Sequence, residues 1–175
     1  FEWVIRRVET RFIFKVDCDS WADPHAATRW LLDNAVGQHW YGGLVTWQGV
    51  VERSGKWAVD TLVFSNATFA PYARGGGYVL AKATAQLIIE AIRTKQSPML
   101  SNIEDASVGL AAFARGIRVV NVPGFKEHIG PDTERAGEVN CCDEGTLLYH
   151  KPRHCCTPAA LSLRNQHEQF SSQTA

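Results

Sequence analysis

The chain has 175 residues, enough for one domain with a sizeable core and too few for two ordinary domains. Hydrophobic residues make up 45% and charged residues 21%, which excludes a mainly disordered or collagen-like chain. Lys and Arg number 18, as do Asp and Glu, so the zero net charge disfavours nucleic-acid binding through anything larger than a local basic patch. No apolar run approaches the roughly 20 residues that cross a bilayer.

The sequence of the first half of the chain predicts one strand, then one helix, then two further strands. A run rich in β-branched and aromatic residues indicates a buried strand, and polar residues follow it. The predicted elements are a strand over 11–16, a helix over 26–36 that starts at Asp23-Pro24, and a hairpin of strands over 42–51 and 56–63 joined at Ser54-Gly55.

The second half predicts two helices and two strands. Apolar residues at helical spacing indicate the helix over 82–95. The other expected elements are a glycine-rich turn over 71–77, a helix over 106–115 with Gly116 as its C-cap, strands over 117–122 and 146–149, and a polar tail from Thr157. Because strands and helices alternate, we expect an α/β sandwich with a mostly parallel sheet.

Asp17-Cys18-Asp19 follows the first strand. Side chains alternate along a strand, so Asp17 and Asp19 should project to one side and Cys18 to the other. Two carboxylates this close repel one another, and a divalent cation removes the conflict by binding both. Alone, the pattern is common and is more often a solvated turn than a cation site.

Three further features carry possible chemistry. Arg74-Gly75-Gly76-Gly77 lacks the spacing of a phosphate-binding loop and indicates close approach by a ligand or another chain. Glu104-Asp105 opens a helix, where an acid complements the helix dipole and a carboxylate base would stay ionised. His150 ends an apolar run and is either a packed histidine or, with two Asp oxygens, a ligand suited to manganese.

The cysteines leave the cellular compartment open. Cys141-Cys142 and Cys155-Cys156 are adjacent pairs and Cys18 stands alone, which fits neither a regular disulfide framework nor a paired zinc motif. One bridge that includes Cys142, formed in an oxidising lumen, is favoured over a small zinc site with His150 and His154. Asn66-Ala67-Thr68 is a glycosylation sequon and supports secretion only weakly.

Taken in order, five segments resemble the inverting β1,3-galactosyltransferases of glycosyltransferase family 31. They are residues 14–21 at the acidic strand end, Trp40-Tyr41-Gly42 with Gly55-Lys56-Trp57, the segment 71–80, residues 104–109, and His150-Lys151. The resemblance runs from about Phe12 to about Lys151. Within the family it is closest to the member that adds galactose to the proteoglycan linkage region, and plant members are also similar.

The resemblance implies a GT-A, Rossmann-like nucleotide-sugar transferase fold and transfer of galactose from UDP-galactose to a glycan or glycoprotein acceptor. It implies Mn²⁺ held by Asp19 and His150 with Asp17 nearby, and Asp105 as the general base. The residues that it places at the substrates are Asp17, Lys15, Trp57, Tyr72, Gly76, Gly77 and Glu104. It implies a catalytic domain over 1–155 and a tail over 156–175.

The sequence departs from the family pattern in three places. Cys18 stands where an aspartate is usual, and Ala106 where a larger apolar residue is usual. Family members carry a cytoplasmic tail, a membrane anchor, a stem and the first β-α-β segments ahead of the residues that match Phe1. The resemblance therefore implies a single-pass Golgi membrane protein with a lumenal catalytic domain, of which this chain holds the metal, sugar and acceptor half.

Two alternatives remain open. A β1,3-N-acetylglucosaminyltransferase would share the same motifs, because the family keeps them across donors. A non-catalytic relic or glycan-binding fragment of the same fold would also fit, since the acidic motif is altered and the nucleotide half is missing.

Overall fold

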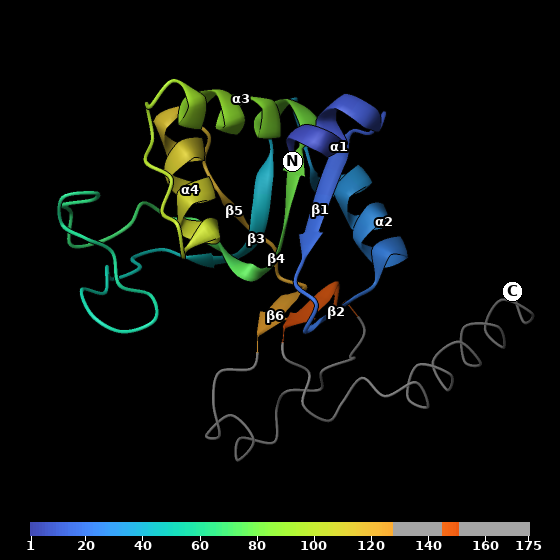
Figure 1. Ribbon diagram of the computed structural model, residues 1–175. Helices are drawn as coiled ribbons and strands as arrows, with labels where there is room; N and C mark the ends of the chain where they lie inside the picture. Colours follow the sequence, from blue (N-terminus) through green and yellow to red (C-terminus); the bar gives the residue numbers. More distant parts are fainter. Residues whose placement is uncertain (128–144, 151–175) are drawn as a thin grey trace, which may run out of the picture.

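The computed structural model describes residues 1–127 and 145–150 (Figure 1). Its helices are α1 (Glu2–Arg7), α2 (Pro24–Asn34), α3 (Lys82–Arg93) and α4 (Glu104–Ala114). Its strands are β1 (Phe12–Val16), β2 (Ser20–Ala22), β3 (Tyr41–Thr46), β4 (Tyr72–Ala81), β5 (Val120–Asn121), β6 (Phe125–Glu127) and β7 (Leu148–His150). The chain is therefore a mixed α/β protein, as predicted.

The main sheet has the order β1-β4-β3-β5. β4 is antiparallel to both β1 and β3, and only the pairing of β3 with β5 is parallel. The prediction of a mostly parallel sheet is therefore wrong for the described residues. A second sheet has the order β2-β7-β6, in which β2 and β7 are antiparallel and β6 and β7 are parallel.

β4 accounts for this difference, because it occupies the stretch predicted as a glycine-rich turn over 71–77. The stretch is instead the first part of a ten-residue central strand. Opposite its glycines the register with β3 shifts between Gly43 and Val45, so that Tyr78 lies across from Gly43 and Ala73 across from Val45. Such a bulge changes the direction in which the intervening side chains point.

The main sheet has helices on both faces (Figure 1). On one face, Tyr78 and Leu80 of β4 pack in a cluster with α3 and α4, and α1 lies at its margin. On the other face, Val79 and Ala81 pack with α2 and with Leu148 of the second sheet. Strand alternation thus supplies two cores to a three-layer α/β/α arrangement.

The predicted helices are confirmed with small shifts at their ends. Asp23 caps α2 as expected, since its side chain accepts a hydrogen bond from the Ala26 N–H at 2.9 Å. Gly116 follows α4 with φ +70°, the left-handed conformation of a helix C-terminus. Within the described ranges, no helix is both long and apolar enough to cross a membrane.

The predicted hairpin between 42–51 and 56–63 is wrong. β3 ends at Thr46 and pairs with β4, while residues 47–71 form a long irregular segment that we call the β3–β4 segment. Val59 is buried in a third cluster beside α4, so its β-branched character reflects packing and not strand pairing. The guanidinium of Arg53 holds the segment by donating to three of its carbonyl oxygens, those of Val59, Phe64 and Asn66, at 2.7–2.9 Å. The side chain of the sequon residue Asn66 is exposed.

Candidate active site

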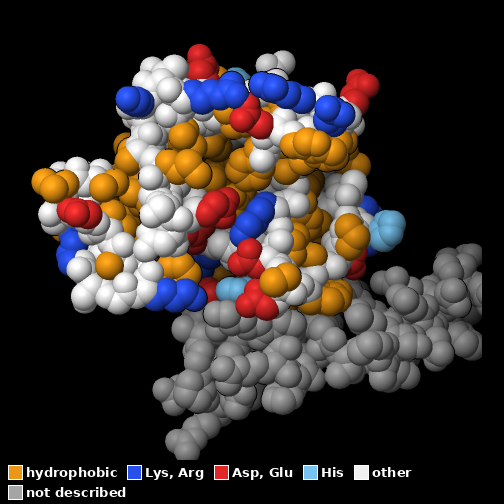
Figure 2. Space-filling view, in the orientation of Figure 1, with side chains coloured by type: hydrophobic (Ala, Val, Ile, Leu, Met, Phe, Trp, Pro, Cys, Tyr) orange, Lys and Arg blue, Asp and Glu red, His pale blue; other side chains and the backbone are white. Residues whose placement is uncertain are grey.

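A cleft of about 630 Å³ opens where β4, the start of α4, the β3–β4 segment and the end of β7 meet. Figure 2 shows acidic side chains gathered around a basic one near the middle of one face, between hydrophobic side chains. Most of the residues predicted to touch substrates or metal line this cleft: Lys15, Asp17, Trp57, Tyr72, Gly76, Glu104, Asp105 and His150.

Asp105 lies at the first turn of α4 with both carboxylate oxygens held by backbone. Oδ2 accepts from the Gly75 N–H at 2.9 Å and Oδ1 from the Ala106 N–H at 2.9 Å. Burial raises the pKa of Asp105 above its ordinary value, although these two hydrogen bonds oppose the shift. A fixed, partly desolvated carboxylate with a raised pKa has the properties of a general base.

Glu104, the other acid of the pair, belongs to a different network. It accepts a hydrogen bond from the hydroxyl of buried Tyr78. Lys15 lies beside it, with Nζ 3.6 Å from Glu104 Oε2 and 2.5 Å from Asp17 Oδ1. Burial followed by the nearby Glu104 carboxylate raises the pKa of Tyr78, so Tyr78 remains a donor. Lys15 therefore links the acids at the end of β1 and at the start of α4.

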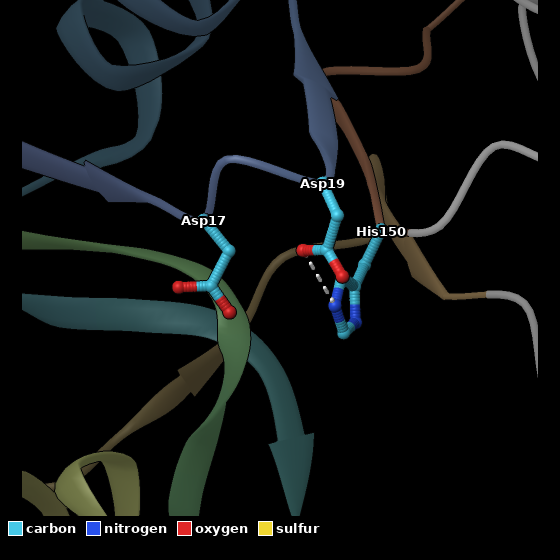
Figure 3. A group of neighbouring side chains, drawn as sticks. All are labelled: Asp17, Asp19 and His150. Carbon is cyan, nitrogen blue, oxygen red and sulfur yellow. Dashed lines mark ion pairs between the residues drawn. The ribbon is translucent and has the colours of Figure 1, made fainter.

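Asp17, Asp19 and His150 form a group whose possible ligand atoms all lie within 4.8 Å of one another (Figure 3). The two aspartates lie in the turn between β1 and β2, where the Ser20 N–H donates to the Asp17 carbonyl, and not on a strand. The prediction that Asp17 and Asp19 share one face of a strand is therefore wrong about the backbone. Their carboxylates nevertheless lie close to one another and to His150. Cys18 between them is exposed with a free thiol.

Glu127 is a component of the cleft that the sequence analysis missed. Its Oε1 lies 3.0 Å from His150 Nδ1 and its Oε2 lies 2.5 Å from an Arg74 guanidinium nitrogen. Burial raises its pKa, but the bonds to Arg74 and His150 outweigh this and leave the pKa below its ordinary value. The only signal in the sequence is an acid after Phe125-Lys126, a stretch that reads as loop.

At each of the three glycines of β4, the missing side chain leaves space that a residue of another element fills. A Cβ on Gly75 would lie 3.3 Å from Asp105 Oδ2, and one on Gly76 would lie 2.4 Å from His150 Cγ. A Cβ on Gly77 would overlap Leu148 at 2.1 Å. The groups that approach these glycines are this chain's own side chains, and the predicted approach of a ligand or another chain stays a prediction. Gly77 faces the second sheet and is not among the residues that line the cleft.

The aromatic residues of the site come from around the β3–β4 segment. Trp57 is 46% exposed at the rim, with Lys56 Nζ 4.4 Å from its ring centroid. Tyr72 is half-buried at the start of β4, and Gly109 of α4 packs so closely on it that a Cβ there would lie 2.3 Å from Tyr72 Cβ. The contact of Gly109 with Tyr72 packs α4, which carries Asp105 in its first turn, against the start of β4.

The charge of the cleft matters for any anionic ligand. Its lining includes the carboxylates of Asp17, Glu52, Glu104, Asp105 and Glu127. It contains two cationic side chains, Lys15 and Arg74, and each is bonded to a carboxylate. A diphosphate could not approach these acids without an added cation. The grouped oxygens and one imidazole suit Mn²⁺ or a similar divalent ion, so the residues fit the metal that the resemblance implies.

Residues 1–123 match the family model described as galactosyltransferase. The chain belongs to the galactosyltransferase family. The match covers the acidic turn, β4 and α4, which carry Asp17, Asp19 and Asp105, and it ends before Glu127 and His150. The predicted resemblance is thereby confirmed at the level of the family.

Two kinds of curated protein are similar to this chain in sequence. UDP-GlcNAc:betaGal beta-1,3-N-acetylglucosaminyltransferase 7 of Rattus norvegicus is 27% identical over 145 residues, which cover 80% of this chain and 36% of that protein. Hydroxyproline O-galactosyltransferase GALT6 of Arabidopsis thaliana is 26% identical over 166 residues, which cover 89% of this chain and 24% of that protein. The chain thus spans about a third or less of the length of these galactosyltransferase-family relatives. The similarity to plant members is confirmed, while the preference for the linkage-region member stays a prediction.

Proposed function

We propose that this galactosyltransferase-family chain is the metal- and acceptor-binding half of a glycosyltransferase with a GT-A fold. The reaction is transfer of galactose from UDP-galactose, with inversion, to form a β1,3 linkage on a glycan or glycoprotein. The observation that carries the proposal is the junction at β4, where Gly75 contacts the candidate base Asp105 and Gly76 contacts the candidate metal ligand His150. One cleft therefore holds the two chemical functions that a single displacement needs.

Asp105 has the role of activating the acceptor. Its carboxylate takes the proton of the attacking hydroxyl as that oxygen bonds to the anomeric carbon of the donor, and attack opposite the leaving group inverts that carbon. Its two backbone hydrogen bonds fix both oxygens without protonating them. General-base assistance of this kind is worth about 10²–10⁴-fold in rate.

Asp17, Asp19 and His150 have the role of holding Mn²⁺. When bound, the ion stabilises the negative charge that develops on the departing UDP. Lys15 keeps Asp17 in place from the side of β1. Gly76 leaves room for the His150 ring beside the acids. Tyr72 and Trp57 supply aromatic surface on which a sugar ring could rest.

The first test compares donors with and without metal. Complete protein that contains this chain should release UDP from UDP-galactose in the presence of acceptor and Mn²⁺. Chelation should abolish the release, and added Mn²⁺ should restore it. Equal activity after exhaustive chelation would contradict the metal role, and absence of turnover with every UDP-sugar would favour a non-catalytic glycan-binding fragment.

A second candidate is transfer of N-acetylglucosamine. It is favoured by the similarity to the rat protein named as a β-1,3-N-acetylglucosaminyltransferase. Asp105 and the metal group would act in the same way, because the two donors differ at the 2-position of the sugar and not at the leaving group. UDP-N-acetylglucosamine is therefore the second donor in the same assay, and a clear preference for it would replace galactose in the proposal.

The pH dependence follows from Asp105. A base must be ionised, and burial raises the pKa of Asp105 above the ordinary aspartate value. As pH falls, kcat/KM should therefore decline at a higher pH than an unperturbed aspartate would dictate. A pH–rate profile measures this limb. The residual rate of Asp105→Asn should lack it, and an unchanged acid limb in that variant would assign the titration to another group.

The proposed location is the Golgi lumen, with a single membrane anchor in the complete protein. It rests on the family membership and on the exposed Asn66 sequon, which would be accessible to glycosylation in the secretory pathway. Lumenal conditions also permit the predicted bridge at Cys142, which lies outside the described residues, as do the other late cysteines and His154.

A further inference from the structure

Three side chains from three strands form a continuous hydrogen-bonded chain behind the metal group. Arg74 of β4 donates to Glu127 Oε2 of β6 at 2.5 Å, and Glu127 Oε1 lies 3.0 Å from Nδ1 of His150 on β7. The Glu127 and His150 side chains are largely shielded from water, at 18% and 12% exposed, whereas Arg74 is 37% exposed. Arg74 is itself held by a bond from Nε to the Thr46 hydroxyl at 3.0 Å.

The chemistry of Glu127 fixes the hydrogen-bonding role of Nδ1 on the His150 ring. An ionised carboxylate only accepts, so Nδ1 of His150 must be the donor in this contact. In a neutral imidazole, Nε2 then carries the lone pair. Nε2 lies 3.3 Å from Asp19 Oδ1, so two electron-rich atoms face one another across the metal group. A cation between them relieves this conflict.

The backbone builds this contact into the second sheet. The parallel register of β6 and β7 places Glu127 directly across from His150. The imidazole packs against Gly76, which leaves the ring no room to turn toward β4. Glu127 is thus set to orient His150 from one side while Gly76 limits it from the other.

We propose that Glu127 is a positioning residue that holds His150 with Nε2 directed at the cation, and that Arg74 in turn fixes Glu127. The inference rests on the proposed metal role of Asp17, Asp19 and His150, and adds to it residues that lie behind the ligands. Carboxylates that hydrogen-bond a ligating histidine in this way raise its basicity and set its orientation.

The first arm of the test measures Mn²⁺ binding to the chain without donor, from the electron paramagnetic resonance signal of free Mn²⁺. Glu127→Gln and Glu127→Ala should weaken binding by about 10–100-fold, the usual effect of losing such a partner. Adding Glu127→Ala to His150→Ala should weaken it no further, because Glu127 acts through His150. Glu52→Gln, which removes one carboxylate from the same cleft, should leave the affinity unchanged.

The second arm needs no metal. Long-range nitrogen–proton NMR spectra of the metal-free chain should show the Nδ1–H tautomer for His150, identified by its loss in His150→Ala, and Glu127→Ala should redistribute the tautomers. Mn²⁺ affinity and tautomer that are both unaffected by Glu127→Ala would overturn the positioning role alone. Absence of Mn²⁺ binding by the unmodified chain would overturn the metal role with it, whatever the tautomer.

Discussion

Asp105→Asn should lower the rate of sugar transfer by about 10²–10⁴-fold, the contribution of a general base. The amide cannot take a proton, and it offers one oxygen where the backbone N–H groups of Gly75 and Ala106 each require an acceptor. The variant should still bind Mn²⁺, because Asp105 is not part of the metal group formed by Asp17, Asp19 and His150. Steady-state kinetics with a saturating donor measure the loss.

Asp33→Asn is the matched control for this result. Asp33 is an exposed carboxylate of α2, on the opposite face of the main sheet, so its neutralisation should leave transfer intact. Full activity in Asp105→Asn would remove Asp105 from the base role. A loss of transfer and of Mn²⁺ binding together would point instead to a general disturbance of the cleft.

Gly76→Ala should weaken Mn²⁺ binding by at least the 10–100-fold that follows loss of a supporting contact. The new methyl group would lie 2.4–2.7 Å from Cγ, Cβ and Nδ1 of His150. These atoms are close to the β7 backbone, so the ring can escape only by moving β7 away from β4. Overpacking of this kind also costs about 1–3 kcal/mol of stability, which thermal unfolding would detect.

Gly75→Ala provides a control one residue away on the same strand. Its methyl group would lie 3.3 Å from Asp105 Oδ2, a contact that a small adjustment relieves, and its three nearest atoms all belong to Asp105. It should therefore disturb transfer while Mn²⁺ binding stays as in the unmodified chain. A folded Gly76→Ala protein with unchanged Mn²⁺ affinity would show that His150 does not ligate the ion.

The helices and the strand before the acidic turn could be predicted from the sequence because their signals are local. The apolar face of α3 and the Asp23 cap of α2 depend on residues within one or two turns. The metal group could also be anticipated, because two of its members are two residues apart. His150 lies more than a hundred residues further along the chain, so the residues alone offered it either as a packed histidine or as a ligand, and the family resemblance favoured the ligand.

The errors arose where tertiary contacts decide the conformation. The glycines of β4 resemble a turn in sequence, but their lack of side chains admits Asp105, His150 and Leu148. Residues 56–63 resemble a strand, yet the Arg53 guanidinium binds the Val59 carbonyl among them and the carbonyls of Phe64 and Asn66 just beyond them. Glu127 has no sequence motif, because its partners Arg74 and His150 come from distant strands.

The adjacency of Gly75 and Gly76 has a consequence for which features of the proposed enzyme can differ between acceptors. One peptide unit separates the contact to the base from the contact to the metal ligand, so the spacing between acceptor activation and leaving-group stabilisation is set by covalent geometry. Trp57, at the rim of the cleft in the β3–β4 segment, lies outside this unit, so its side chain can change without altering that spacing. Acceptor preference could thus differ among such enzymes while the spacing between the base and the metal ligand stays the same.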